Sequence, residues 1–244
     1  MRPGAAATSP PHAAETPANT RVYAVGDIHG RADLLADAMV RIDDDRARRP
    51  IEHAIEVYLG DYIDRGLDSK TVIDLLSVRL VNNRAVCLRG NHEALMEDFL
   101  RDPTNLRPWL KLGGTETLAS YGVILRPGAE TEIDLHHRFW SAFPRAHEMF
   151  LQCLRYSFCC GDFMFVHAGI RPGIAIEQQH FHDLLWIRRE FLNSPQDHGK
   201  YVVHGHTPVG HPDIRRNRMN IDTGAWRSGT LTCVAIEGTE ILVL

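Results

Sequence analysis

The stretch VYLGDYIDRG, residues 57–66, joins strand-forming apolar residues directly to two carboxylates and a guanidinium. Its apolar residues predict a buried strand that ends near Leu59, so that Asp61, Asp64 and Arg65 follow at the carboxyl end of the strand. Ligands of open α/β sheets bind at this end, where loops collect side chains from several strands. The stretch therefore predicts both an α/β sheet and the edge of that sheet that carries a site.

Two other segments repeat the pattern of an apolar strand that runs into polar residues, namely RVYAVGDIHG at 21–30 and AVCLRGNHE at 85–93. The segments between the three predicted strands, 31–45 and 69–80, carry apolar residues at the i, i+3, i+4 spacing of amphipathic helices. Strands that alternate with helices pair in parallel through right-handed crossovers. The three polar clusters should therefore meet at one edge of a parallel sheet.

The chain changes character after a further helix predicted at 92–101. Residues 104–145 have helical patterns, including one at 132–143, and we expect an α-rich insertion that lies over the sheet. Short strands joined by glycine-containing turns follow and imply a second, mixed sheet: 155–160, 163–167, 201–204, 219–221, 231–236 and 241–244. Two mixed sheets packed face to face, with helices on both outer sides, make a four-layer α/β sandwich.

Composition narrows the class of protein. The 244 residues are enough to form one α/β catalytic domain with a full hydrophobic core, which we place at 21–244. The tail at 1–20 is rich in Ala, Pro and Thr and is predicted to be disordered. A net charge of −4 and a pI near 6.4 give no electrostatic reason to expect nucleic acid or a membrane as partner. No apolar run is long enough to cross a bilayer. Five cysteines without paired spacing fit a reducing cytoplasm, where we expect a monomer.

The polar residues at the strand ends are of the kind that hard divalent metal ions require, because such ions need several carboxylate, imidazole or amide oxygen donors at one point. Five strand ends supply them: Asp27 and His29, Asp61, Asn91, the histidine of FVHAG at 165–169 and the histidines of VVHGHT at 202–207. Asp61 suits a bridging role, since one carboxylate can serve two cations about 3.5–4 Å apart. A single histidine would more often be structural, whereas five such clusters together predict a dinuclear metal site.

These motifs also resemble a known family, the phosphoprotein phosphatase group of the calcineurin-like metallophosphoesterases, in its bacterial and phage serine/threonine phosphatase form. The resemblance spans residues 21 to about 225 and rests on five motifs in order: GDIHG at 26–30, GDYIDRG at 60–66, RGNHE at 89–93, HAG at 167–169 and GHT at 205–207. It implies a calcineurin-like fold and a phosphatase activity.

The resemblance implies how two metal ions would be held. Asp27, His29 and Asp61 would bind one, and Asp61, Asn91, His167 and His206 the other. His206, which precedes the threonine of the GHT motif, is the implied ligand, and His204 is expected to be a core or supporting residue. The donor set suits Mn²⁺, Fe²⁺ and Zn²⁺, and we expect Mn²⁺ to support activity in vitro.

Hydrolysis of a phosphate monoester needs a nucleophile, neutralised phosphoryl oxygens and a proton for the leaving oxygen. A hydroxide that bridges the two metal ions is the expected nucleophile. Arg65 and Arg188 resemble the phosphate-binding arginines of the family, because guanidinium forks match paired phosphate oxygens, although Arg189 could take the place of Arg188. Asn91 is expected to contact the phosphate as well as a metal ion. His92 is placed to protonate the leaving oxygen, with Asp64 orienting its ring.

Three functions are compatible with these residues. We favour a phosphatase acting on phosphoserine or phosphothreonine in proteins, or with dual specificity on phosphotyrosine as well, because GHTP at 205–208 and LLW at 184–186 look closer to bacterial protein phosphatases. The alternative is a symmetrical dinucleoside tetraphosphate hydrolase, which shares the motifs. A non-catalytic binding module is a third possibility from another class, but such modules usually lose a metal ligand or the acid.

Overall fold

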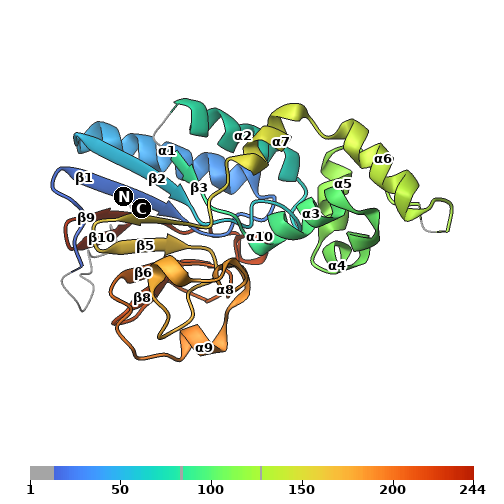
Figure 1. The fold of residues 1–244 in the computed structure, drawn as a ribbon. Coiled ribbons are helices and arrows are strands. Elements are labelled where there is room, and N and C mark those ends of the chain that lie inside the picture. The colour runs from blue at the N-terminus through green and yellow to red at the C-terminus, as the bar shows by residue number, and fades with distance from the viewer. Residues whose placement is uncertain (1–13, 83–84, 127) are drawn as a thin grey trace.

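A computed structural model of the chain describes residues 14–82, 85–126 and 128–244. Two five-stranded β-sheets lie face to face, and helices cover the outer side of each sheet (Figure 1). The strand order is β10-β9-β1-β2-β3 in the first sheet and β4-β5-β6-β8-β7 in the second. This arrangement is the predicted four-layer α/β sandwich.

The first sheet has a parallel half that carries the first three polar clusters. β1 pairs in parallel with β2, and β2 pairs in parallel with β3, as the alternation of strands and helices predicts. Their carboxyl ends therefore open on the same edge of the sheet. The strands of this sheet are β1 (Thr20–Val25), β2 (His53–Tyr58), β3 (Ala85–Cys87), β9 (Cys233–Glu237) and β10 (Glu240–Val243).

The second sheet delivers the two remaining histidine motifs. Its three central strands β5, β6 and β8 are parallel, and β4 and β7 are antiparallel strands at its edges. His167 follows β5, and His206 follows β6 after one intervening glycine. The strands of this sheet are β4 (Ser157–Cys160), β5 (Phe163–Val166), β6 (Tyr201–His204), β7 (Asp213–Ile214) and β8 (Arg218–Asn220).

The prediction that the last two strands belong to the second sheet is wrong. β9 pairs antiparallel with β1 in the first sheet, with Arg21 opposite Glu237 and Val25 opposite Cys233, and β10 pairs with β9. Residues of β9 alternate between two cores, since Cys233 and Ala235 face the helices and Val234 and Ile236 face the other sheet. A strand that is apolar on both faces fits the interior of either sheet, so its residue pattern does not decide which one it joins.

Three apolar layers hold the sandwich together. Alternate residues of β1 show this division, because Tyr23 and Val25 pack toward the helices of the first sheet and Val22 and Ala24 pack between the sheets. A third cluster, which includes Val166 and Phe191, lies between the second sheet and its own helices. Such alternation follows from the two-residue period of a strand that is covered on both sides.

The helices begin and end close to the predicted bounds in the first half of the chain. Prolines and glycines separate the shorter helices of the second half. The helices are α1 (Ala32–Arg48), α2 (Ser69–Asn82), α3 (Asn91–Arg101), α4 (Leu106–Leu110), α5 (Gly114–Ser120), α6 (Glu132–Ala142), α7 (Arg145–Gln152), α8 (Phe181–Trp186), α9 (Arg189–Leu192) and α10 (Ala225–Ser228), with 3₁₀ turns η1 (Pro103–Asn105) and η2 (Ile176–Gln178).

The insertion predicted at 104–145 is helical where it is described, but it does not lie over the sheet. Helices α4, α5 and α6 extend beyond the carboxyl ends of β1, β2 and β3, at the right of Figure 1. Aromatic residues form their core, with Trp109 stacked on Phe99 of α3 at 5.3 Å between ring centroids and 5.5 Å from the ring of Phe139. The insertion thus extends the molecule beside the polar strand ends.

The prediction of a disordered tail at 1–20 extends too far toward the domain, because the last residues of this range pack against it. Residues 1–13 lie outside the described residues, but Ala14 is buried and Thr16 donates its backbone N–H to the carbonyl of Gly238 at 3.1 Å. The carbonyl of Glu15 accepts a hydrogen bond from the backbone of Asp162 at 2.9 Å. Residues 14–19 therefore join the β9–β10 turn to the β4–β5 turn, a pairing that the Ala-, Pro- and Thr-rich composition of residues 1–20 does not reveal.

Within the three described ranges, we find no helix with both the length and the apolar character needed to cross a membrane. The longest described helix, α1, carries several aspartates and arginines along its 17 residues.

Gly26 marks a close approach of the two sheets directly before Asp27. A Cβ atom at this position would lie 2.4 Å from the carbonyl oxygen of Ile221, which belongs to the backbone and cannot rotate away. We predict that Gly26→Ala lowers the free energy of unfolding in urea by about 1–3 kcal/mol, the usual range for overpacking. Gly210→Ala is the matched control, because its Cβ would meet open space. Equal stability of the two variants would contradict the prediction.

Candidate active site

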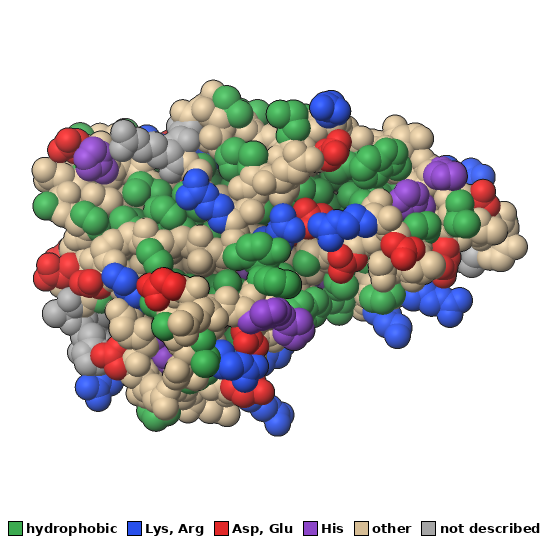
Figure 2. Space-filling view, viewed as in Figure 1, with side chains coloured by type: hydrophobic (Ala, Val, Ile, Leu, Met, Phe, Trp, Pro, Cys, Tyr) green, Lys and Arg blue, Asp and Glu red, His purple; other side chains and the backbone are tan. Residues whose placement is uncertain are grey.

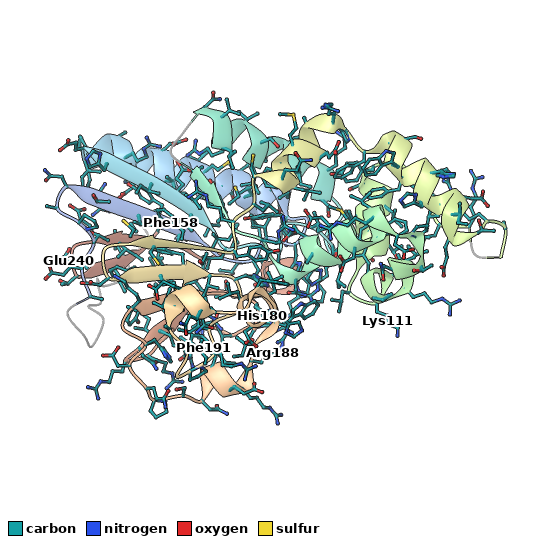
Figure 3. All side chains as sticks on the ribbon, in the orientation of Figure 1. Lys111, Phe158, His180, Arg188, Phe191 and Glu240 are labelled. Atoms are coloured by element: carbon teal, nitrogen blue, oxygen red, sulfur yellow. The ribbon has the colours of Figure 1, made fainter. Side chains whose placement is uncertain are left out.

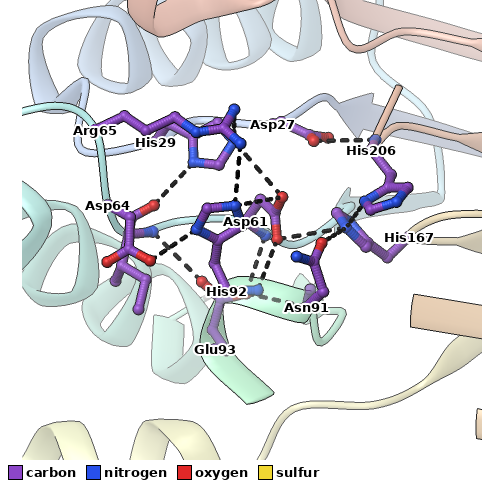
Figure 4. A network of polar contacts seen from close by, with 12 residues as sticks. Asp27, His29, Asp61, Asp64, Arg65, Asn91, His92, Glu93, His167 and His206 are labelled. Carbon is purple, nitrogen blue, oxygen red and sulfur yellow. Dashed lines mark hydrogen bonds and ion pairs between the residues drawn. The ribbon is translucent and has the colours of Figure 1, made fainter. Parts of the chain in front are cut away.

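Side chains from five strand ends converge on one buried point between the sheets. The six predicted metal ligands each have an exposed fraction of 5% or less: Asp27, His29, Asp61, Asn91, His167 and His206. Asp27, His29 and Asp61 come from the loops after β1 and β2, Asn91 is the first residue of α3 after β3, and the two histidines follow strands of the second sheet (Figure 4). The structure therefore brings together residues that are separated by up to 179 positions in the chain.

Asp61 lies at the centre of this group. Its Oδ1 is 3.3 Å from Nε2 of His167, and its Oδ2 is 3.5 Å from Nε2 of His29. One carboxylate thus faces a histidine from each sheet with a different oxygen. Two sets of side chains have ligand atoms close enough together to hold an ion, and Asp61 belongs to both: His29, Asp61 and His92 form one, and Asp61, His167 and His206 the other. This geometry suits a carboxylate that bridges two cations.

Backbone carbonyls fix the tautomers of two of these histidines. His29 Nδ1 is 2.9 Å from the carbonyl oxygen of Ile63, and His167 Nδ1 is 3.0 Å from that of Leu59. A carbonyl can only accept, so Nδ1 must carry the hydrogen in both rings. The lone pair is then on Nε2, which points at Asp61 in each case. Histidines that bind metal ions are oriented by the same kind of hydrogen bond.

The remaining candidate ligand atoms face one another with few hydrogen-bond donors between them. Nε2 of His167 lies 3.0 Å from Oδ1 of Asn91 and 3.1 Å from Nδ1 of His206. Oδ2 of Asp27 accepts the backbone N–H of His206 at 3.0 Å, whereas its buried Oδ1 meets no hydrogen-bond donor among the described residues. An unpartnered buried carboxylate oxygen is costly unless a cation satisfies it. The residues present therefore fit a pair of divalent metal ions.

Burial sets the charge of these groups. Loss of solvent, reinforced by the neighbouring His92, lowers the pKa of His29 to about 3, and loss of solvent with His167 nearby lowers that of His206 to about 2. Both imidazoles are therefore neutral near pH 7 and keep a lone pair for a ligand. Burial, with Asp222 and Asp61 close by, raises the pKa of Asp27 well above its usual value, as expected for carboxylates gathered without a counter-ion.

His92 has a different partner from the ligand histidines. Its Nδ1 is 2.7 Å from Oδ2 of Asp64, and both side chains are buried. Although burial by itself lowers the pKa of His92, the carboxylates of Asp61 and Asp64 outweigh it and raise the value. The two carboxylates thus favour the charged ring, which would have no lone pair for a metal ion, even though Nε2 of His92 lies near His29 and Asp61. This environment suits a proton donor better than a ligand.

The two predicted phosphate-binding arginines border the site on different sides. Arg65 is half-buried, with Nη1 3.2 Å from Nε2 of His29 and Nη2 3.3 Å from Nε2 of His92. Its guanidinium lies 5.4 Å from the centre of the Trp226 ring, a cation–π contact. Arg188 is exposed and donates to the Thr207 hydroxyl at 3.4 Å (Figure 3). Arg188 thus reaches the residue next to His206, whereas Arg189 already begins α9.

Several site residues adopt backbone conformations that non-glycine residues rarely occupy. The φ angles are positive at His29 (47°), Asp61 (52°), Asp64 (71°), Arg65 (68°) and His206 (66°). Each such residue costs of order 1–3 kcal/mol and persists only where the surrounding structure holds it. Five of the six positive-φ non-glycine residues among the described parts of the chain thus lie in this one site.

Sequence reasoning missed the residues that support this backbone. The buried carboxylate of Glu93 accepts hydrogen bonds from the backbone N–H groups of Gly90 and Asp61 at 2.9 Å and of Tyr62 at 2.8 Å. Its place in the RGNHE motif beside His92 was the available signal. Trp109 and Thr117 contact Asp64 from the insertion, and nothing in their local sequence indicates this contact.

His204 stays outside the ligand group, as expected. It is fully buried, with Nδ1 3.1 Å from the carbonyl oxygen of Gly205 and Nε2 3.4 Å from a guanidinium nitrogen of Arg218. Burial and the Arg218 charge lower its pKa to about 3. It is therefore a neutral core residue that packs edge-on against Phe191 at 5.0 Å.

Comparison with known proteins decides the family. The model of the calcineurin-like phosphoesterases matches residues 20–225, which is most of the chain. The chain belongs to this family. The predicted resemblance is thus confirmed, and curated relatives include bacterial serine/threonine phosphatases of the predicted group. The chain is therefore a phosphoesterase, and the family implies divalent metal ions at the site described above.

Relatives of this phosphoesterase carry two kinds of name. The bis(5'-nucleosyl)-tetraphosphatase PrpE (asymmetrical) of Halalkalibacterium halodurans is 26% identical over 89% of this chain and 91% of its own length. Serine/threonine-protein phosphatase 1 of Salmonella typhimurium is 28% identical over 88% of this chain and 92% of its own. A crystal structure described provisionally as a diadenosine tetraphosphatase has a TM-score of 0.64, with 20% identity, over 95% of this chain and 97% of that one.

The central position of Asp61 in the phosphoesterase site leads to a prediction about metal content. We expect Asp61→Asn to weaken binding of Mn²⁺ at both ion positions by at least about tenfold, because the variant keeps the shape but removes the shared charge. His167→Gln should affect only one ion. Metal analysis and calorimetric titration would measure both. Asp68→Asn removes an exposed carboxylate from the same loop and should change nothing. A single lost ion in Asp61→Asn would exclude a bridging carboxylate.

Proposed function

We propose that the chain hydrolyses phosphate monoesters with two divalent metal ions, and that phosphoserine and phosphothreonine in proteins are its substrates. The observation that carries this proposal is the buried pair of His92 and Asp64 beside the ligand group, with 2.7 Å between Nδ1 and Oδ2. An imidazole held in this way can keep a proton at neutral pH and deliver it to a substrate oxygen. Cleavage of an alkyl ester needs such a proton.

In this proposal Asp27, His29 and Asp61 would hold one ion, and Asp61, Asn91, His167 and His206 would hold the other. The ions, with Mn²⁺ the expected metal and Fe²⁺ or Zn²⁺ as alternatives, would lower the pKa of a coordinated water and neutralise charge on the phosphoryl oxygens. The buried Asp27 and the neutral histidines support this distribution.

The chain's own cations then orient the phosphate. Arg65 reaches toward the ligand group from the β2 side and Arg188 from the β6 side, so the two guanidiniums can hold a phosphoryl group between them. Asn91 can donate its amide N–H to a phosphoryl oxygen, since its Oδ1 faces His167. The stacking of Arg65 on Trp226 limits the rotamers that this arginine can adopt.

The leaving group distinguishes an ester from an anhydride. A serine or threonine alkoxide is a strong base and needs a proton as the P–O bond breaks, whereas a nucleoside polyphosphate leaves as a weak base. His92 Nε2 lies 3.7 Å from Asp61 and 3.3 Å from Arg65, so a proton on this nitrogen would lie close to a phosphate held by Arg65. A dedicated acid therefore favours the monoester over the anhydride.

Hydrolysis of dinucleoside tetraphosphates is the second candidate. It is favoured by the relative from Halalkalibacterium halodurans, which matches 89% of this chain. That relative is named for the asymmetrical reaction, not for the symmetrical cleavage considered from the sequence. The complete set of ligands and the acid speak against a third possibility, a non-catalytic binding module.

The acid role predicts a leaving-group effect. We expect His92→Asn to keep both metal ions but to lose about 10²–10⁴-fold in kcat on phenyl phosphate, the usual contribution of a general acid. The loss on 4-nitrophenyl phosphate should be much smaller, because that leaving group is a weaker base. Steady-state kinetics with metal analysis would measure this. Near wild-type kcat on both esters would refute the acid role.

The choice between the two substrates has its own test. The enzyme would be stripped of metal with a chelator and reloaded with Mn²⁺, Fe²⁺ or Zn²⁺, and kcat/KM would be measured on phosphoserine, phosphothreonine and phosphotyrosine peptides and on diadenosine tetraphosphate. We expect Mn²⁺ to restore the most activity and a phosphopeptide to be the better substrate. A higher kcat/KM on diadenosine tetraphosphate would replace the protein phosphatase by the second candidate.

A further inference from the structure

The helical insertion reaches the catalytic centre through two side chains. Trp109 of α4 donates its indole N–H toward the carboxylate of Asp64, with Nε1 3.1 Å from both Oδ1 and Oδ2. Thr117 of α5 donates its hydroxyl to Oδ1 of the same carboxylate at 2.6 Å. Asp64 in turn is the only described carboxylate within hydrogen-bond distance of His92 Nδ1. Two successive hydrogen bonds, with Asp64 between them, therefore connect the insertion to the proposed acid.

The donors around Asp64 form a consistent network. Since a carboxylate only accepts, the three donors His92, Trp109 and Thr117 fix both its oxygens. The Thr117 hydroxyl gives its single proton to Asp64, and its oxygen accepts the backbone N–H of Asp64 at 2.9 Å. The hydroxyl of Ser69, 3.0 Å away, can donate to the same oxygen. Asp64, Trp109 and Thr117 are all fully buried, so water does not compete for these bonds.

We propose that Trp109 and Thr117 are positioning residues for the chemical step, which hold the Asp64 carboxylate in the orientation that aims Nε2 of His92 at the leaving oxygen. This inference rests on the proposed function of His92 as the acid. A carboxylate with one donor could rotate about its χ2 angle, whereas three donors from α3, α4 and α5 leave it a single orientation.

The insertion also supports the backbone that carries this carboxylate. Asp64 and Arg65 have φ angles of 71° and 68°, which are unfavourable for side chains of this kind. The backbone N–H of Arg65 donates to the carbonyl of Gly113 at 3.3 Å. A Cβ at Gly113, whose φ is 107°, would lie 2.8 Å from that same nitrogen, so only glycine allows this approach. The turn between α4 and α5 thus packs directly against the backbone of Asp64 and Arg65.

Aromatic packing keeps the Trp109 indole in place. Its ring stacks on Phe99 at an interplanar angle of 29° and contacts Phe139 of α6 at 44°. Burial raises the pKa of the Asp64 carboxyl above its usual value, and hydrogen bonds from His92, Thr117 and Trp109 make that rise smaller. The same donors that orient the carboxylate therefore also help to keep it ionised.

The experiment compares variants that remove a donor with variants that keep it. Thr117→Val removes the hydroxyl at nearly constant shape, and Thr117→Ser keeps it. Trp109→Phe removes the indole N–H but retains an aromatic ring. Phe139→Leu is the matched control, because it disturbs the same aromatic cluster without touching the Asp64 hydrogen bonds. Each variant would be loaded with Mn²⁺, and its metal content, thermal stability and kcat on phenyl phosphate and 4-nitrophenyl phosphate would be measured.

We expect Thr117→Val and Trp109→Phe to lose at least about tenfold in kcat on phenyl phosphate and far less on 4-nitrophenyl phosphate, as a part of the effect of a general acid. Thr117→Ser should restore most of the activity. Phe139→Leu should lower thermal stability without changing the ratio of the two rates. Equal losses on both esters in the donor variants would overturn the proposal, since a general structural defect would not depend on the leaving group.

His92→Asn separates this inference from the proposed function. If His92→Asn shows the leaving-group effect and the donor variants do not, the positioning role is wrong and the acid role stands. If His92→Asn itself shows no such effect, the acid role fails, and the positioning role fails with it. In the His92→Asn background, Thr117→Val should cause no further loss on phenyl phosphate, because residues that act through one another are not additive.

Discussion

Four backbone N–H groups point at one buried carboxylate, that of Glu93, and the site depends on this contact. The donors are Gly90 at the start of α3 and Asp61, Tyr62 and Ile63 in the loop after β2, at 2.8 to 3.3 Å. Glu93 therefore ties two loops from neighbouring strands into one unit. It offsets the cost of the positive φ angle at Asp61, and it sets the distance between Asp61 and the first residues of α3. Without the Glu93 carboxylate, no shared hydrogen-bond acceptor would hold these two loops in a fixed position relative to each other.

The buried histidines differ in the hydrogen-bond partner of their Nδ1 atom. His29 and His167 donate from Nδ1 to backbone carbonyls, so that each is neutral and presents a lone pair. His92 has the carboxylate of Asp64 at the same position, which favours the charged ring. One neighbouring oxygen, a neutral carbonyl in one case and a charged carboxylate in the other, thus distinguishes the candidate ligand histidines from the proposed proton donor.

The position of the helical insertion gives it two roles in the same molecule. It closes one side of the site and, through Trp109, Thr117 and Gly113, it contacts the segment that holds Asp64 and Arg65. The opposite side of the site, at Arg188, is exposed and built from the second sheet. The space-filling view shows charged and apolar side chains interspersed over the visible face, without a single dominant patch (Figure 2).

The sequence by itself determined the parallel strands, the helices between them and the polar residues at the strand ends, because periodicity and turn residues act over a few positions. It also indicated the six candidate ligands and the His92–Asp64 pair, since short motifs carry them. Only the tertiary structure decided that β9 and β10 join the first sheet and that residues 14–19 pack against the β9–β10 and β4–β5 turns. It also decided that the insertion lies beyond the strand ends and that its Trp109 and Thr117 reach Asp64. These are pairings between distant segments, which depend on which surfaces remain uncovered when the chain closes and leave no mark in local residue patterns.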